Sequence, residues 1–421
     1  MTEALVSQLV DHLFRHKAGQ MVSALTRLFG VDNLELVEDI VQDTLLKALQ
    51  QWPYRGIPDN PGGWLWQVAK NRALDVLRRE AGFQKMFEGQ IDLIEAEQIP
   101  APEEASADSF GNDLLNMMFI GCHPVLSREV QVALVLKTVG GFSVAEIARA
   151  FLVPEATISQ RLVRAKNKLR VEDVRFEFPP DHELTKRLGA VLEVLYLLFN
   201  EGYDAHAGES LVRQDLCLEA IYLCRLVAAH PIGQHPRVHA LLALILLQTS
   251  RLKARTDSEG NIILLAEQER SLWDQEMIHA GIYHLGLSAE GHELSEYHLQ
   301  AGIAAKHAIA ESYESTDWIG ILNDYETLLE FVPTPIVLLN FAVAIAMVHG
   351  PQAGLDELSK LKGHAALKKY HLLQATFGEL YERSGNFQQA AQSYREALLL
   401  TSNEAEQRFL QRKLLALGVL L

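Results

Sequence analysis

The sequence predicts an all-α protein with three helical parts joined by two polar segments. Apolar residues recur at three- and four-residue steps through most of the 421 residues, which is the period of a helix with one buried side. Residues 86–112 are rich in acids, Pro, Ala and Ser, and a second junction at 175–181 contains two prolines. A chain of this length is enough for two or three domains.

The most informative stretch is FSVAEIARAFLVPEATISQRLVRAKNKLR, from Phe142 to Arg170. Ser143 followed by Glu146 is a capping box, so one helix is expected to start at Val144. A second helix is expected from about Pro154, because proline has no N–H to donate and is best tolerated in a first turn. Its apolar residues predict a buried stripe made of Ile158, Leu162, Ala165 and Leu169.

Two short helices across a tight turn, the second one basic, predict a DNA-binding helix-turn-helix. Between Glu155 and Arg170 the only acid is Glu155, against five Lys or Arg residues. The alternative is an ordinary helical hairpin with a solvated basic face; the agreement of cap, turn and charge favours DNA. The residues expected to face DNA are Thr157, Ser159, Gln160, Arg161, Arg164 and Lys166.

The net charge of the chain is -16, which disfavours binding to naked DNA because phosphate neutralisation dominates non-specific affinity. The acids are concentrated elsewhere: Met86 to Asn112 contains seven acids and no Lys or Arg. We expect this segment to be a flexible or loosely folded linker. A DNA-binding chain with this overall charge is expected to be held on DNA by a carrier partner.

Residues 1–80 are expected to form helices. Asn33 is a candidate N-cap for a helix over 34–52. A loop rich in Pro, Gly, Asp and Asn is expected over 53–63, followed by a helix over 64–80. The first of these helices is predicted to turn Leu36, Ile40, Val41, Leu45, Ala48 and Leu49 inward, and Glu38, Asp39, Gln42 and Asp43 outward.

The helix over 64–80 is predicted to carry a polar strip opposite an apolar side. Basic residues next to an aromatic one suit single-stranded nucleic acid, because bases stack on rings while cations follow phosphates. The alternative is that both tryptophans belong to the core and the charges form a solvated face. The strip holds Gln67, Lys70, Asn71, Asp75 and Arg78, with Trp64 and Leu74 among them, and the apolar side holds Leu65, Trp66, Val68, Ala69, Ala73 and Val76.

After the linker, helix is expected to resume over 113–140, with Ser127 as an N-cap and Val130 and Leu134 inside. Residues 173–421 are expected to form a large helical domain. Its segment 370–400 alternates small and large residues as a tetratricopeptide (TPR) pair does. Helices are predicted at 184–199, 211–229, 235–250, 267–287, 293–313, 317–331, 334–348, 351–361, 365–384, 387–400 and 403–418.

Helical arrays of this kind give a concave surface, so binding or docking is expected of this domain rather than chemistry. Polar residues and tryptophans at the ends of apolar helices predict a pocket between repeats. The alternative is that they serve as helix caps and inter-helix hydrogen bonds. The candidate pocket residues are Arg251, Arg255, Arg270, Trp273, His298, Gln300 and Trp318.

The sequence contains no P-loop, GxGxxG, HExxH or nucleophile elbow, so no enzyme activity, catalytic residue or cofactor is expected. The histidines between His279 and His307 match no metal template, and no metal is expected. Three cysteines without paired spacing indicate a reducing cytosol; Cys217 and Cys224 are expected to fill core. No apolar run approaches the length of a membrane span, which predicts a cytoplasmic protein with no membrane partner.

Two stretches in this order resemble a known family. The segment EDIVQDTLLKALQQWPYRGIPDNPGGWLWQVAKNRALDVLRRE, Glu38 to Glu80, resembles region 2 of bacterial extracytoplasmic-function (ECF) sigma factors of the sigma-70 family. Ser127 to Arg170 resembles their region 4, and the acidic linker lies where that family has one. The phrases LEVLYLLFNEGY (192–203) and ALLLTSNEAEQRFLQRKL (397–414) are similar to the subgroup with an added helical, TPR-containing extension.

The resemblance implies four parts and a set of partners. Residues 1–85 would be sigma region 2, which binds core polymerase and the −10 element, and 86–112 the linker. Residues 113–172 would be the region 4 helix-turn-helix for the −35 element, and 173–421 a TPR-like regulatory domain. The implied partners are core RNA polymerase, through its β′ clamp helices and β flap, promoter DNA, and a protein or small-molecule regulator of the C-terminal domain.

The resemblance also implies roles for particular residues. The outward residues Asp39, Gln42 and Asp43 would face the β′ coiled-coil clamp. The loop from Tyr54 to Asn60 would capture a flipped base, whose lost stacking costs a few kcal/mol. The helix from Glu155 would enter the major groove. The implied −10 residues are Tyr54, Arg55, Asp59, Asn60, Trp64, Lys70, Asn71, Arg78 and Arg79.

Two other functions remain open from the residues themselves. One is a ligand-responsive helix-turn-helix regulator in which 1–80 is only structural. The other is a TPR-like protein-interaction adaptor whose basic helix is incidental. In the leading hypothesis the extension gates promoter use, either by folding back on the sigma core or by docking a regulator.

Overall fold

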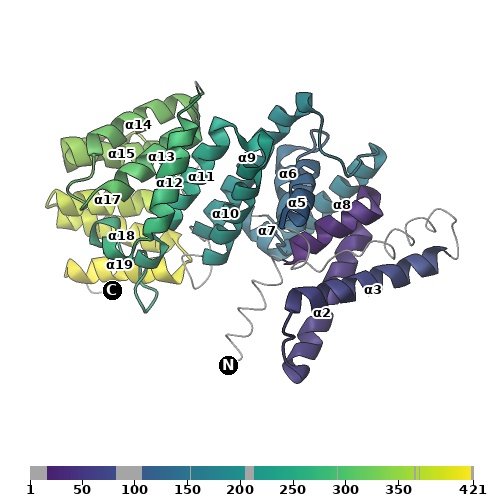
Figure 1. The fold of residues 1–421 in the computed structure, drawn as a ribbon. Helices are drawn as coiled ribbons and strands as arrows, with labels where there is room; N and C mark the ends of the chain where they lie inside the picture. Colours follow the sequence, from purple (N-terminus) through teal and green to yellow (C-terminus); the bar gives the residue numbers. More distant parts are fainter. Residues whose placement is uncertain are drawn as a thin grey trace. The chain divides into compact units, whose positions relative to one another are not determined.

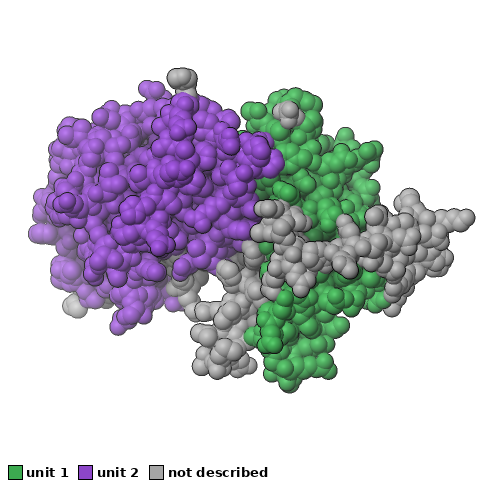
Figure 2. Space-filling view, in the orientation of Figure 1, with its two compact units in different colours: residues 1–198 green, residues 199–421 purple. Residues whose placement is uncertain are grey.

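The computed structural model describes residues 17–81, 107–203 and 213–418, apart from 152, 292, 365, 366 and 369. Helices make up nearly all the regular structure of the described residues (Figure 1), together with one isolated antiparallel bridge between Thr256 and Ile262. This confirms the all-α prediction. The chain divides into two compact units, 1–198 and 199–421 (Figure 2).

The first half of unit 1 contains a helical stretch over 17–29, a 3-10 turn and helices α2 (Leu34–Arg55) and α3 (Pro61–Ala81). Helix α2 continues through Pro53 and ends at Gly56, whose φ of 82° suits the residue that closes a helix. Helix α3 begins at Pro61, a residue whose fixed φ suits a first turn. The predicted loop over 53–63 is therefore wrong at both ends, and the actual loop is 56–60.

Several predictions for these helices are wrong in detail. Asn33 does not cap α2 with its side chain, because its Nδ2 atom donates instead to the carbonyl of Phe29 at 2.7 Å. Leu49 is exposed. Leu74 is buried rather than part of a polar strip. The buried face of α2 is rotated from the predicted one and consists of Leu34, Val37, Ile40, Val41, Thr44, Ala48 and Trp52.

The second half of unit 1 contains α5 (Ala107–Gly121), α6 (Arg128–Thr138), α7 (Val144–Ala150) and α8 (Glu155–Val171). Helix α5 begins inside the predicted linker 86–112, and linker residues before 107 lie outside the described part. Ser127 occupies the N-cap position of α6 but makes no side-chain cap hydrogen bond there. Methionines 117 and 118 and Phe119 of α5 are fully buried against α6.

Three contacts among the described residues illustrate how the two halves of unit 1 are joined. A Cβ atom on Gly19 would lie 2.1 Å from the carbonyl oxygen of Val139, so only glycine allows this approach. Arg27 pairs with the buried Asp113 at 3.2 Å. The third contact, between Glu38 and Lys166, lies at the helix-turn-helix and is described below.

Helix α9 (Asp181–Tyr203) contains the boundary between the two units. Its earlier residues belong to unit 1: Arg128 bonds Glu193 and donates to the carbonyl of Gly189 at 2.9 Å. Arg187, which is buried, pairs with Glu183 one turn earlier. Removing all of α9 would therefore strip contacts from unit 1.

Unit 2 continues with helices that follow the predicted order closely. Each helix from α12 onward packs on the next one along the chain. The predicted helix over 267–287 begins late, because 265–272 forms two 3-10 turns and Asp274 caps α12 by accepting from the N–H of Met277 at 3.0 Å. The helices are α10 (Gln214–Ala229), α11 (Pro236–Thr249), α12 (Gln275–Ser288), α13 (Glu296–Ile309), α14 (Trp318–Phe331), α15 (Pro335–His349), α16 (Pro351–Ser359), α17 (His371–Arg383), α18 (Phe387–Leu400) and α19 (Glu404–Ala416).

Helices α17 and α18 form the pair with the TPR-like pattern. Tyr394 is buried against Gly378, where an added Cβ atom would lie 2.5 Å from the ring. Ala390 and Ala397 are also fully buried in this contact region. The small-against-large packing agrees with the sequence pattern, and the assignment of the whole array as TPR-like stays a prediction.

Candidate nucleic-acid interface

The helix-turn-helix is built by the local signals that predict it. The backbone N–H and side-chain hydroxyl of Ser143 both donate to Glu146 at 2.8 Å, and the N–H of Glu146 donates back to the Ser143 hydroxyl at 3.2 Å. This reciprocal capping box starts α7. Pro154 occupies the N-cap of α8. The buried stripe of α8 is the predicted one, Ile158, Leu162, Ala165 and Leu169.

The face of α8 opposite this stripe is available to a partner. Ser159, Gln160 and Arg164 are exposed, and Thr157 is half-buried. Val163 and Asn167 lie on the same exposed side, one turn from Gln160 and Arg164. The predicted DNA-facing set does not include these two residues, although their three- and four-residue spacing from Gln160 and Arg164 identifies them.

Two basic residues of α8 are already paired with acids. Arg161 lies 2.9 Å from Glu129, and Lys166 lies 2.7 Å from Glu38. The side chains of Lys166 and Glu38 are only 16% and 15% exposed. The predicted outward position of Glu38 is therefore wrong, because the helix-turn-helix covers it within unit 1. Lys166 cannot contact a phosphate without leaving this carboxylate.

The outer face of α2 presents the predicted acidic and amide groups. Asp39, Gln42 and Asp43 are exposed side chains on consecutive turns of the helix. Asp43 also pairs with Arg72 of α3 at 3.1 Å, and about half of each of these two side chains is exposed. The structure thus brings this face next to the polar side of α3.

The residues predicted for the −10 element lie at the end of α2, in the loop after it and on α3. Tyr54 is 90% exposed in the last turn of α2, next to the exposed Arg55. Asn60 accepts from the N–H of Gly63 through its side chain and so caps α3. Asp59 is exposed in the loop between these helices.

On α3, the two tryptophans have different environments. Trp66 is buried, whereas Trp64 is half-buried with its ring 5.6 Å from that of Trp52 in an edge-to-face arrangement. Asn71 is exposed and accepts from Gln67 at 3.0 Å, and Lys70 is half-buried nearly two turns after Trp64. The side chains of Arg78 and Arg79 lie outside the described residues.

The candidate pocket residues of unit 2 fall into two groups. Arg251 and Trp318 line one cavity. The other candidates do not line it. Arg255 lies over the Tyr203 ring at 4.0 Å, and Arg270 lies over Trp273 at 4.7 Å while donating to the carbonyls of His307 and Ala310. His298 completes the capping box of α13 with Ser295, and Gln300 is half-buried in the same helix.

The cysteines of the described residues are free and buried, as expected for Cys217 and Cys224. Burial raises the pKa of each thiol to about 12, so none is a thiolate near neutral pH. Among the described residues no three His, Cys, Asp or Glu side chains converge as a metal site would require. In the same part of the chain, no helix has the length and apolar character needed to cross a membrane.

Comparison with known proteins gives three family matches along the chain. Residues 13–83 match sigma-70 region 2, and residues 117–169 match sigma-70 region 4. Residues 187–289 match a family of unknown function, DUF6596. No solved structure matches the chain.

Two relatives extend these matches. An uncharacterized protein of Rhizobium meliloti (strain 1021) is 36% identical over 397 residues, which is 94% of this chain and 92% of that protein. The ECF RNA polymerase sigma factor SigL of Mycobacterium tuberculosis is 32% identical over 169 residues, 40% of this chain and 90% of SigL.

A helix-turn-helix preceded by a region 2 module defines the class of sigma-70 proteins. The chain belongs to the ECF sigma factors, with a C-terminal DUF6596 helical extension. Its sigma modules imply binding to core RNA polymerase and promoter DNA, and the family is not enzymatic. The match to region 2 favours this function over a helix-turn-helix regulator whose first 80 residues are only structural.

Proposed function

We propose that the chain directs promoter-specific initiation by reading two DNA elements from the two modules of unit 1. The −35 element would be read by α8 in the major groove, with Ser159, Gln160 and Arg161 at base edges and Thr157, Arg164 and Lys166 near phosphates. The exposure of Ser159, Gln160 and Arg164 opposite the buried stripe supports this assignment.

The −10 element would be held by the loop after α2 and the polar side of α3. A flipped base can stack on an aromatic ring that is free of core contacts. Tyr54 offers such a ring, since it is 90% exposed. Arg55, Asp59 and Asn60 border it, and Lys70 and Asn71 lie along α3 beside Trp64. Arg78 and Arg79 would follow on the same helix.

Core polymerase would be the carrier that the net charge of -16 requires. Asp39, Gln42 and Asp43 would meet basic residues of the β′ clamp helices, and the region 4 module would meet the β flap. The exposed acidic face of α2 supports the first contact, since carboxylates at an interface steer and orient a basic partner.

The extension would regulate this activity by binding a regulator, so that unit 2 gates promoter use. What supports a regulatory role is a helical unit of more than two hundred residues that carries no polymerase or promoter module of its own. A TPR-like array is suited to such docking.

Transcription in vitro tests the central proposal. Core polymerase with the full-length chain should start transcripts from a cognate promoter, and pull-down should recover the core. The double change Asp39→Ala and Gln42→Ala should weaken core binding about tenfold, while Gln50→Ala, another exposed position on α2, should not. Failure to recover core, with no transcripts from any promoter tested, would overturn the proposal.

Truncation after Tyr203 tests the regulatory part. This cut keeps α9, whose Arg187 and Glu193 contact unit 1. The gating proposal expects promoter output to change severalfold, in either direction. Unaltered output and unaltered response to cellular conditions would contradict it.

A further inference from the structure

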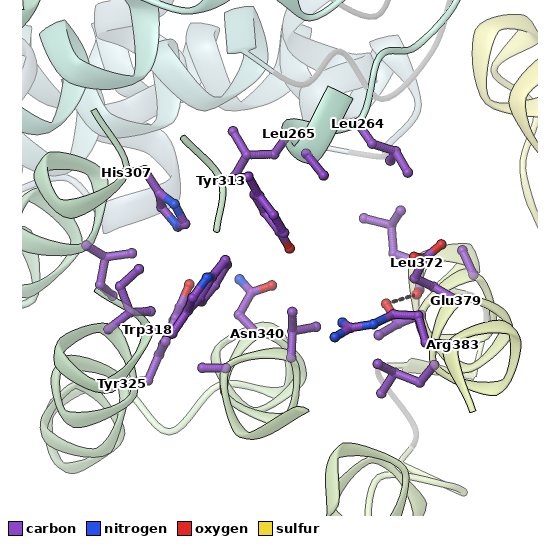
Figure 3. A pocket seen from close by; sticks show the side chains of 18 of the residues that line it. Leu264, Leu265, His307, Tyr313, Trp318, Tyr325, Asn340, Leu372, Glu379 and Arg383 are labelled. Carbon is purple, nitrogen blue, oxygen red and sulfur yellow. Dashed lines mark hydrogen bonds between the residues drawn. The ribbon is translucent and has the colours of Figure 1, made fainter. Parts of the chain in front are cut away.

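Unit 2 contains a half-open cavity of about 530 Å³ (Figure 3). Its walls come from α11, α13, α14, α15, α17, α18 and α19, together with residues 264–266. Small-molecule sites typically have volumes of roughly 300–1,000 Å³ and apolar walls with few polar groups. The cavity has this size and this mixture of aromatic, aliphatic and charged residues.

A bridge between distant parts of the chain closes the array around this cavity. Arg408 of α19 donates to the carbonyl of Gly260 at 3.4 Å and to the side chain of Asn261 at 3.3 Å. Arg412 donates to the carbonyl of Ile262 at 3.1 Å. Leu264 and Leu265, which follow this segment, complete one wall (Figure 3). The bridge therefore fixes the position of the segment that supplies this wall of the cavity.

One side of the cavity is aromatic. The ring of Trp318 lies edge to face with His307 at 5.2 Å and with Tyr313 at 5.3 Å, and Tyr325 lies on the same side (Figure 3). Rings that hold one another in this way stay rigid, so a planar ligand can stack on them at low entropic cost. This side therefore favours an aromatic ligand.

The charges around the cavity select an anion rather than a cation. Arg383 reaches toward Asn340 in Figure 3 and contacts the Met347 sulfur at 3.1 Å, while Arg251 donates to Gln248 at 3.0 Å. Among the described residues no acid lies within ion-pair distance of either arginine. Glu379, an acid of the wall, lies 3.1 Å from Lys413, which it shares with Glu382 at 3.2 Å, and it accepts from the Tyr394 hydroxyl at 3.3 Å.

His307 adds a polar group that its neighbours do not satisfy. Its Nδ1 atom is buried and has no hydrogen-bond partner among the described residues. Burial, followed by the positive charges of Arg251 and Arg270, lowers the pKa of His307 to about 4, so the imidazole is neutral near pH 7. The ring of His307 therefore adds no charge to the cavity wall.

We propose that this cavity is a binding site for a small aromatic anion. Its ring would stack beside Trp318 and Tyr313, and its anionic group would pair with Arg251 and Arg383. Charge-assisted hydrogen bonds to guanidinium groups are the strongest contacts that such a site can offer. This inference rests on the regulatory proposal, because a ligand bound in unit 2 would be the signal for gating. Binding of the ligand can nevertheless be measured directly, without a transcription assay.

Two fluorescent probes that differ in charge test the site on the full-length chain. 1-Anilinonaphthalene-8-sulfonate is an aromatic anion, and N-phenyl-1-naphthylamine is the same ring system without the sulfonate. The anion should bind saturably with one probe per chain. The double variant Arg251→Gln and Arg383→Gln should weaken the anion at least tenfold and the neutral probe less than twofold. Arg395→Gln, an exposed arginine on α18, is the matched control and should change neither.

A second variant separates the cavity from surface binding. Ala375→Phe places a ring in the cavity wall and should displace both probes while helicity and the melting temperature are retained. If the double arginine variant binds the anion within twofold of the wild type, or if Ala375→Phe folds and still binds it normally, the proposal is overturned. Probe binding with unaltered transcription after truncation would instead overturn only the gating role.

Discussion

The cationic side chains on the helices of unit 1 that are proposed to bind DNA differ from those at the cavity of unit 2 in what surrounds them. In unit 1, Lys166 and Arg161 of α8 pair with Glu38 and Glu129, and Arg72 of α3 pairs with Asp43. In unit 2, Arg251 and Arg383 at the cavity contact an amide and a sulfur atom. The first set is neutralised inside the unit, and the second set is not.

This difference indicates two modes of anion binding. A phosphate that reaches Lys166 or Arg161 must replace a carboxylate, so each of these two contacts returns less free energy than an unpaired cation would. Weak intrinsic DNA affinity agrees with a chain of net charge -16 that depends on polymerase to bring it to promoters. An anion that enters the cavity of unit 2 replaces no carboxylate at Arg251 or Arg383.

The largest effect is expected on α8. Gln160→Ala should cost the holoenzyme about 1–3 kcal/mol of discrimination at one base pair of the −35 element, because a base-edge contact is lost. Arg164→Ala should weaken binding across all sequences and reduce the salt slope by about one. Arg175→Ala, an exposed position after the helix, is the control. Competition binding with single-base promoter variants measures these effects; equal losses on every sequence from both changes would contradict the base-reading role.

The next effect concerns how rigidly unit 2 builds its cavity. Gly378→Ala should destabilise the chain by about 1–3 kcal/mol, because the new Cβ atom would lie 2.5 Å from the Tyr394 ring at the cavity wall. Gly286→Ala, in α12 with nothing within 4 Å, should stabilise it by up to about 1 kcal/mol. Urea unfolding of the two variants measures these changes in stability. If both unfolding midpoints move in the same direction, the contact between Gly378 and Tyr394 is not tight.

A smaller effect is expected from releasing Lys166. Glu38→Gln keeps the shape of the side chain and removes its charge, so promoter DNA should bind roughly two- to fivefold tighter, the range expected for a pair worth up to about 1 kcal/mol. The gain should disappear in the double variant with Lys166→Gln. If Glu38→Gln leaves the affinity for promoter DNA unchanged at low salt, the ion pair between Lys166 and Glu38 does not compete with phosphate.

The smallest effect is a pH dependence of unit 2. Burial and the stacked neighbour His239 lower the pKa of His284 to about 4, as burial does for His307. Between about pH 6.5 and 4 the unfolded chain binds protons that the folded chain does not, so stability should rise with pH in this window and fall on acidification. His284→Gln should reduce the fall in melting temperature between about pH 6.5 and 4. His279→Gln, at an exposed position, should leave this pH dependence unchanged.

Much of the local structure could be predicted because its causes lie within one or two helical turns. The capping box of Ser143 and Glu146 and the stripe from Ile158 to Leu169 are examples. Errors arose where a distant segment decided the outcome. Leu49 matched the apolar period of α2 but is exposed, and Glu38 matched its polar face but is covered by α8. The region 2 and region 4 resemblance supplied the family from the sequence itself.

The sequence by itself determined the helices, the helix-turn-helix and the family, because periodicity, capping and motif order are properties of contiguous residues. Only the tertiary structure decided which acids neutralise the basic helix, since Lys166 and Glu38 are 128 positions apart. It alone also decided that the helical array is closed: the bonds from Arg408 and Arg412 to 260–262 join segments about 150 positions apart. Contacts of this range depend on how whole helices pack, and no local pattern encodes them.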